Sequence, residues 1–303
     1  MTRFLGVDLA WAEGTAAKPA NESGLACIDE TGRVIEAGWA RGIDEVVDWI
    51  QRLGEPGAVL AIDAPLVVNN PTGMRECERE TGSRYGRWHV AANASNQALP
   101  RLGGVTLRGR LEQLGWAYTD GLDPVGAQMS SFLECYPYTT LVGAPEFGYD
   151  DKRPRYKRMG SALPILERRA QRALVCDDLI ERMWRLHAAS PPLDLATHEA
   201  SDSLVTERTP LADAAYKHRE DLIDALLCAW TASLWHRYGT ARSQILGAAD
   251  SLVVDGRRGT IIAPARLEQR RGDDRVRAAA FGAASLSAVA LSAPAASAPS
   301  PVR

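Results

Sequence analysis

The sequence predicts a single α/β domain with a mixed sheet, helices on its faces and a small hairpin near its C-terminus. Short apolar runs typical of strands recur through the first half of the chain. One amphipathic helix pattern lies between two of these runs, which favours a crossover between parallel strands. With 303 residues and 46% hydrophobic content, the chain has enough apolar side chains for a large core.

The first strands are expected at residues 3–11, 23–29 and 34–41, and the tight turn between the last two predicts an antiparallel meander. A helix follows at residues 43–53, where apolar residues recur every three or four positions up to Gly54. The next buried strand, at residues 58–66, is then expected to run parallel to the first.

The later elements complete the prediction. We expect helices at 74–80 and 105–116 within an insertion around 69–126, a strand at 131–139, helices at 162–187 and 217–238, and a closing hairpin made of 251–254 and 260–263. No repeat or linker divides residues 1–263, which predicts one domain. Residues 264–303 are dominated by Ala, Ser and Pro towards the end and predict a disordered tail.

Composition and charge exclude several classes of protein. A net charge of −3 excludes a protein that coats nucleic acid through overall basicity, so any such contact must be regional. Five scattered cysteines without a C-x-x-C pair indicate neither a zinc site nor a disulfide framework, and favour the reducing cytoplasm. The uncharged stretch 278–302 lacks the Leu, Ile, Val and Phe density of a bilayer-crossing helix, so no membrane partner is expected.

Acidic residues occur where strands end and on one helix. Asp8 and Asp63 close two apolar strands, Glu134 lies within a third, and Asp221 and Asp224 share one side of the last long helix. Sites in α/β proteins form at the carboxyl ends of parallel strands, so these side chains are expected to converge. Taken singly, each has another interpretation: a turn cap, a solvated strand residue, or an acid complementing the helix dipole.

A cluster of carboxylates in a partly buried place needs cations to stay ionised. Oxygen ligands without Cys or His select Mg²⁺ or Mn²⁺. Two such ions about 3.5–4 Å apart would activate a water molecule and stabilise the leaving oxygen in phosphodiester hydrolysis. The constellation therefore predicts phosphoryl chemistry.

Four segments in order carry a resemblance to a known family: GVD, AIDAPL, FLECYP and DLIDALLCAWTA. Together they resemble the predicted nuclease family of RNase H fold catalogued as domain of unknown function 429, over roughly residues 3–263. The last helix also resembles the D-x-x-D-A-L helix of RuvC-type resolvases. The resemblance implies an RNase H-like fold and a two-metal nuclease site at Asp8, Asp63, Glu134 and Asp224, with Asp221 as a further or alternative ligand.

A basic loop follows the strand that carries Glu134. We expect it to hold phosphates of a nucleic acid, although a basic loop can also be only solvated; its basic residues are Lys152, Arg153, Arg155, Lys157 and Arg158. Two other functions remain open. One is a small-molecule phosphotransferase or ATPase on the same fold, for which residues 10–14 are a poor phosphate loop. The other is a nucleic-acid-binding module without catalysis.

Overall fold

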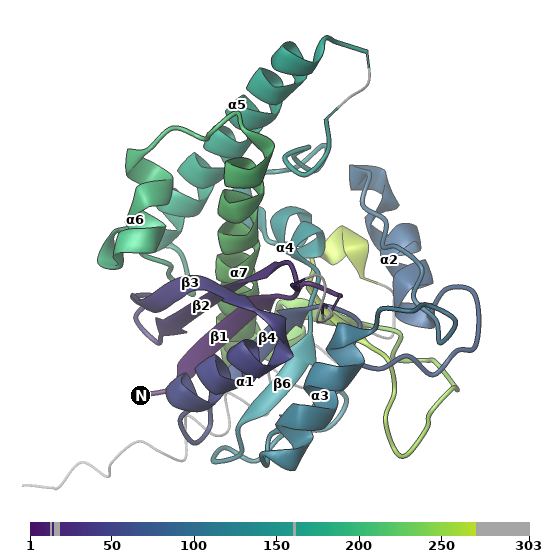
Figure 1. Cartoon of the computed structure of the whole chain (residues 1–303). Helices are drawn as coiled ribbons and strands as arrows, with labels where there is room; N and C mark the ends of the chain where they lie inside the picture. Colours follow the sequence, from purple (N-terminus) through teal and green to yellow (C-terminus); the bar gives the residue numbers. More distant parts are fainter. Residues whose placement is uncertain (13, 15–18, 160–161, 271–303) are drawn as a thin grey trace, which may run out of the picture.

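The computed structural model describes residues 1–12, 14, 19–159 and 162–270. Its centre is a six-stranded mixed sheet with the strand order β3-β2-β1-β4-β6-β5 (Figure 1). The strands are β1 (Arg3–Asp8), β2 (Glu22–Asp29), β3 (Val34–Arg41), β4 (Val59–Asp63), β5 (Ala117–Tyr118) and β6 (Ser131–Glu134). β7 (Ser243–Leu246) and β8 (Ile261–Pro264) form a separate antiparallel hairpin. The predicted α/β class is confirmed.

The antiparallel meander and the parallel crossover predicted from the sequence are both present. β2 pairs with β1 and β3 in antiparallel fashion. The chain then passes through helix α1 (Gly42–Leu53) and returns as β4, parallel to β1. In this register Asp8 lies directly opposite Asp63. The two strand-end carboxylates therefore start from adjacent backbone positions.

Helices cover both faces of the sheet (Figure 1). Helix α7 (Asp213–Tyr238) packs against β1, β2 and β4 on one face, and α1 packs with α3 (Gly103–Gln113) on the other. Successive strand residues point to opposite faces. Leu5 and Val7 accordingly join the core under α1, whereas Phe4 joins the core around α7. By the same alternation Asp8 lies on the face that α7 covers.

Helix α7 lies unusually close to the sheet, because glycines face it from β1 and β2. A Cβ on Gly6 would lie 2.0 Å from the Ala225 carbonyl oxygen and 2.3 Å from the Ala229 nitrogen. A Cβ on Gly24 would lie 2.0 Å from the Asp221 carbonyl oxygen. These contacts are with helix backbone, which cannot rotate away. The glycines therefore set the distance between the sheet and the acidic turns of α7.

Gly6→Ala is expected to destabilise the fold by at least about 1–3 kcal/mol, the usual cost of overpacking, because α7 must shift away from β1. Urea unfolding measures this effect. Gly38→Ala in β3 is the matched control, since a Cβ there meets nothing within 4 Å. Equal stabilities for the two variants would show that the close approach of α7 does not constrain the fold.

The insertion between β4 and β6 contains more regular structure than predicted. Helix α2 (Glu76–Tyr85) extends beyond the expected residues 74–80 and continues into a 3-10 turn, Gly86–Trp88. Helix α3 occupies Gly103–Gln113, near the predicted 105–116. The short strand β5 was not predicted, because its two residues are too few to show a period.

The prediction of a strand at residues 131–139 was wrong for the residues after 134. β6 ends at Glu134, and helix α4 (Pro137–Gly143) begins three residues later. Pro137 occupies the first turn of that helix, where a missing backbone N–H costs nothing. The proline is thus a helix start and not the end of a strand. Further along the chain lie α5 (Ile165–Trp184), α6 (Glu199–Thr206) and short 3-10 turns at Pro145–Phe147, Arg185–Ala188, Leu195–Thr197 and Gly239–Ala241.

The partners of the C-terminal hairpin also differ from the prediction. β8 pairs with Ser243–Leu246 and not with residues 251–254. Residues 251–254 are exposed to solvent, and their backbone forms only an isolated bridge between Val254 and Arg257. All four residues of β7 are buried, so pairing there removes more apolar surface from water.

The described structure continues past the predicted domain end at 263. Leu267–Gln269 form a 3-10 turn, and the buried Arg270 donates hydrogen bonds to the carbonyls of Thr240 and Ala241. Residues 271–303 of the predicted disordered tail lie outside the described residues. No helix among the described residues is long and apolar enough to cross a membrane.

Candidate metal centre

Three of the predicted carboxylates converge at the carboxyl ends of β1 and β4. Asp8, Asp63 and Asp224 each place one carboxylate oxygen so that all three oxygens lie within 4.8 Å of one another. The first two come from adjacent parallel strands, and Asp224 comes from the middle of α7, where its side chain is completely buried. The three side chains thus offer an all-oxygen donor set built from rigid elements.

Burial and mutual repulsion disfavour the charged forms of these acids. The pKa of Asp8 is raised by burial and then by the charge of Asp224. The pKa of Asp63 is raised well above its ordinary value by burial, with further contributions from Asp8 and Asp224, while Lys157 opposes the shift. A cation between the carboxylates would remove this penalty. The donor set therefore fits a hard divalent cation such as Mg²⁺ or Mn²⁺.

Two side chains of the basic loop reach into the cluster. The Lys157 ammonium lies 2.5 Å from Asp224 Oδ2 and 3.8 Å from Asp63 Oδ2. The Tyr156 hydroxyl donates a hydrogen bond of 2.5 Å to Asp224 Oδ1. Sequence patterns had assigned Lys157 only to nucleic-acid binding and had assigned no role to Tyr156. Local sequence carries no signal for these contacts, since they join a loop to a helix far along the chain.

Asp221 lies beside this group and contacts a different lysine. Its carboxylate forms an ion pair with Lys217, which also lies 3.1 Å from Glu220. Asp221 also shares a side-chain hydrogen bond with Asp8, which requires a proton on one of the two carboxyl groups. Burial and the Asp8 charge raise the pKa of Asp221 to about 8, although Lys217 opposes the shift. Asp221 is thus close enough to act as a further ligand.

The raised pKa of Asp221 predicts how the stability of the metal-free protein depends on pH. An Asp side chain in the unfolded chain titrates near ~3.9, and Asp221 in the folded chain near about 8. The folded state therefore binds the proton more tightly. The stabilisation that the Asp221 carboxyl group contributes is complete below pH ~4 and is lost as the pH rises towards about 8.

Urea unfolding in the presence of a chelator at several pH values tests this prediction. The free energy of unfolding should fall more steeply between pH 5 and 8 in the unmodified protein than in Asp221→Asn, which cannot ionise there. The difference between the two proteins isolates this residue from the other acids. Parallel curves would contradict the prediction.

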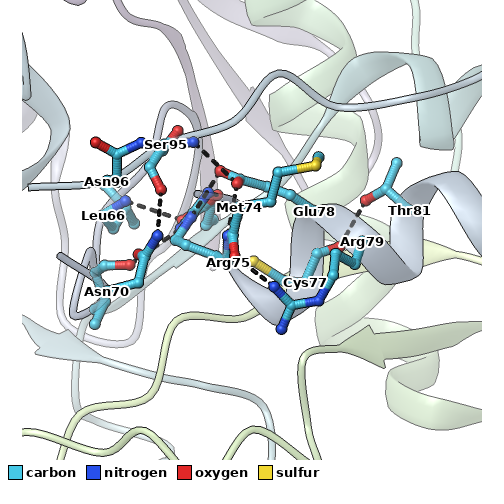
Figure 2. A network of polar contacts seen from close by, with 12 residues as sticks. Leu66, Asn70, Met74, Arg75, Cys77, Glu78, Arg79, Thr81, Ser95 and Asn96 are labelled. Atoms are coloured by element: carbon cyan, nitrogen blue, oxygen red, sulfur yellow. Dashed lines mark hydrogen bonds and ion pairs between the residues drawn. The ribbon is translucent and has the colours of Figure 1, made fainter. Parts of the chain in front are cut away.

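Glu134 is held by a different set of partners. Arg75 donates to both of its oxygens, at 2.6 and 2.8 Å, and the Leu66 backbone N–H donates to Oε2 at 2.9 Å. Arg75 also donates to Glu78 at 2.8 Å (Figure 2). All three charged side chains are buried. Glu134 is outside the group of three convergent carboxylates found among the described residues.

Strand alternation explains this placement. Glu134 pairs with Ile62, whose side chain belongs to the core under α1, whereas Asp63 is one residue further along β4. Paired residues of parallel strands point to the same face, so Glu134 and Asp63 lie on opposite faces of the sheet. A small pocket near both residues has a volume of about 50 Å³ open to water-sized molecules, with Arg75 in its wall. The pocket has room for a few water molecules only.

The five basic residues of the loop have three different environments. Lys152, Arg155 and Arg158 are exposed to solvent. Arg153 lies over the ring of Tyr138 at 4.1 Å and donates to the His89 carbonyl at 2.7 Å. Lys157 points to the carboxylates, as described above. Three of the predicted phosphate-binding side chains are thus free to meet a ligand in solution.

The sheet, with its antiparallel strands followed by parallel ones, is compatible with the class of RNase H-like α/β proteins. The chain belongs to the family described as "Protein of unknown function (DUF429)", whose model matches residues 6–250. That range contains the three convergent aspartates, Asp221 and Glu134. No curated protein and no solved structure matches the chain.

Proposed function

We propose that this chain is a Mg²⁺- or Mn²⁺-dependent nuclease that hydrolyses phosphodiester bonds. One observation supports this most directly: Asp8, Asp63 and Asp224 bring three carboxylate oxygens within 4.8 Å of one another. Asp8 and Asp63 lie at the carboxyl ends of parallel strands, where α/β proteins place their sites. A cluster made only of oxygens favours hard divalent cations, which serve phosphoryl transfer.

The residues of the chain have distinct roles in this proposal. Asp8, Asp63 and Asp224 hold the metal, and Asp221 is positioned to contribute beside Asp8. Tyr156 fixes the orientation of the Asp224 carboxylate through its hydroxyl. When bound, a divalent cation lowers the pKa of water and stabilises charge on phosphate oxygens. The exposed Lys152, Arg155 and Arg158 are available to contact the backbone of a nucleic acid.

The test uses labelled single-stranded, duplex, hybrid and branched nucleic acids with Mg²⁺, with Mn²⁺ and with a chelator. Cleavage of at least one substrate is expected only with metal, and Asp8→Asn and Asp224→Asn should remove it. Undiminished cleavage by both variants would refute the proposal. Nucleotide-dependent thermal stabilisation without cleavage would instead favour a phosphotransferase, and nucleic-acid binding without cleavage would favour a binding module.

A further inference from the structure

Lys157 is a cation already built into the carboxylate cluster. We infer that its ammonium group occupies the place that a second metal ion would take, so that the site binds a single divalent cation. The inference rests on the proposed metal-dependent function and assigns the number of ions that the site holds. It departs from the two-metal arrangement expected from the sequence.

The position of the ammonium group is the first support. It lies 2.5 Å from Asp224 Oδ2 and 3.8 Å from Asp63 Oδ2, which places it next to two of the three carboxylates that would share ions. Asp224 Oδ2 is buried, and the Lys157 ammonium group beside it compensates its charge. A second ion bridging Asp63 and Asp224 would have to displace Lys157.

The loop that carries Lys157 is anchored by residues that precede the lysine. The preceding residue, Tyr156, is fully buried, donates through its hydroxyl to Asp224 and accepts at its carbonyl from the Tyr216 hydroxyl at 2.6 Å. Arg153 N–H donates to the Trp88 carbonyl at 3.0 Å. The ammonium group also lies 5.5 Å from the ring centre of Tyr138. These contacts hold the lysine at the cluster and oppose its displacement.

The ligand that a second ion would require is engaged elsewhere. The sequence had proposed Glu134 as the fourth carboxylate, but both of its oxygens accept hydrogen bonds from Arg75. Releasing Glu134 would leave the buried Arg75 with Glu78 alone among its carboxylate partners. Breaking a buried ion pair of this kind is strongly destabilising, because it leaves a buried charge without its partner.

The net charge of the cluster also favours a single divalent cation. Asp8, Asp63 and Asp224 carry three negative charges when ionised, and Lys157 supplies one positive charge. One divalent cation would neutralise the two negative charges that remain. A second would leave a buried excess of positive charge, which is costly away from water. Asp221 and Lys217 lie beside this group in an ion pair of their own, and their opposite charges cancel when both are ionised.

The experiment is a Mn²⁺ titration of the full chain at neutral pH, followed by calorimetry and by electron paramagnetic resonance, which detects magnetic coupling between paired Mn²⁺ ions. The unmodified protein should bind one Mn²⁺ and show no coupling. Lys157→Ala should bind two, because it vacates the position and leaves the cluster more negative. Lys157→Arg keeps the charge and should still bind one.

Arg110→Ala is the matched control, since it removes one positive charge from an exposed pair with Asp44 between α1 and α3. It should bind one ion. If Lys157→Ala does not fold by circular dichroism, Lys157→Gln replaces it. Binding of two ions, or of none, by the unmodified protein overturns the inference, as does a single ion in the charge-removing variants of Lys157. Two ions together with cleavage would refute the inference and leave the nuclease proposal standing, whereas one ion without cleavage would do the reverse.

Discussion

Asp224→Asn is expected to abolish tight Mn²⁺ binding and to reduce metal-dependent cleavage by at least about 100-fold, because metal ions contribute several kcal/mol to such reactions. Asp224 is the cluster's fully buried member and lies within reach of both other aspartates. An amide has the same shape as the carboxylate and can still accept the hydrogen bond from Tyr156. The loss therefore reflects removal of the charged ligand and not of the side chain's position.

Calorimetric Mn²⁺ titration and single-turnover cleavage measure the two effects, with circular dichroism to verify the fold. Asp44→Asn is the matched control, because that carboxylate lies in an exposed pair with Arg110. It should bind and cleave like the unmodified protein. Metal affinity in Asp224→Asn within a few fold of the unmodified protein would remove Asp224 from the proposed site.

Arg75→Met is expected to destabilise the fold by about 3–5 kcal/mol, the cost of leaving buried charges without a partner. Arg75 is 5% exposed and is the cation between Glu134 and Glu78, both of which are also buried. Met has a similar length and fills much of the space. The expected loss therefore comes from the unpaired carboxylates, which burial already disfavours: it raises the pKa of Glu134, while Arg75 opposes that shift.

Arg79→Met, in the first turn of α2, provides the control. Arg79 pairs with Glu76 at the same spacing, but its side chain is 56% exposed, so the change should cost at most about 1 kcal/mol. Adding Glu134→Gln to Arg75→Met should recover part of the stability, because it removes one unpaired charge. Equal unfolding free energies for Arg75→Met and Arg79→Met would contradict a structural role for the buried network.

The first half of the sheet could be predicted from the sequence because its signals are local. Residues 4–7 and 59–62 are continuous apolar runs, and α1 shows a clear helical period between two strands. Together with the right-handed crossover rule, these patterns were enough to place Asp8 opposite Asp63. The insertion and the hairpin were harder, since β5 has two residues and the partner of β8 is set by burial and not by closeness in sequence.

The sequence by itself determined which acids end β1 and β4 and which acid lies in the apolar part of α7, because strand ends and helix periods are properties of short segments. Only the tertiary structure decided the membership of the cluster. The register of β6 against β4 turned Glu134 to the face away from Asp63. A loop distant in sequence brought Lys157 to Asp224. Both outcomes depend on long-range packing, in which a one-residue change of register moves a side chain to the opposite face.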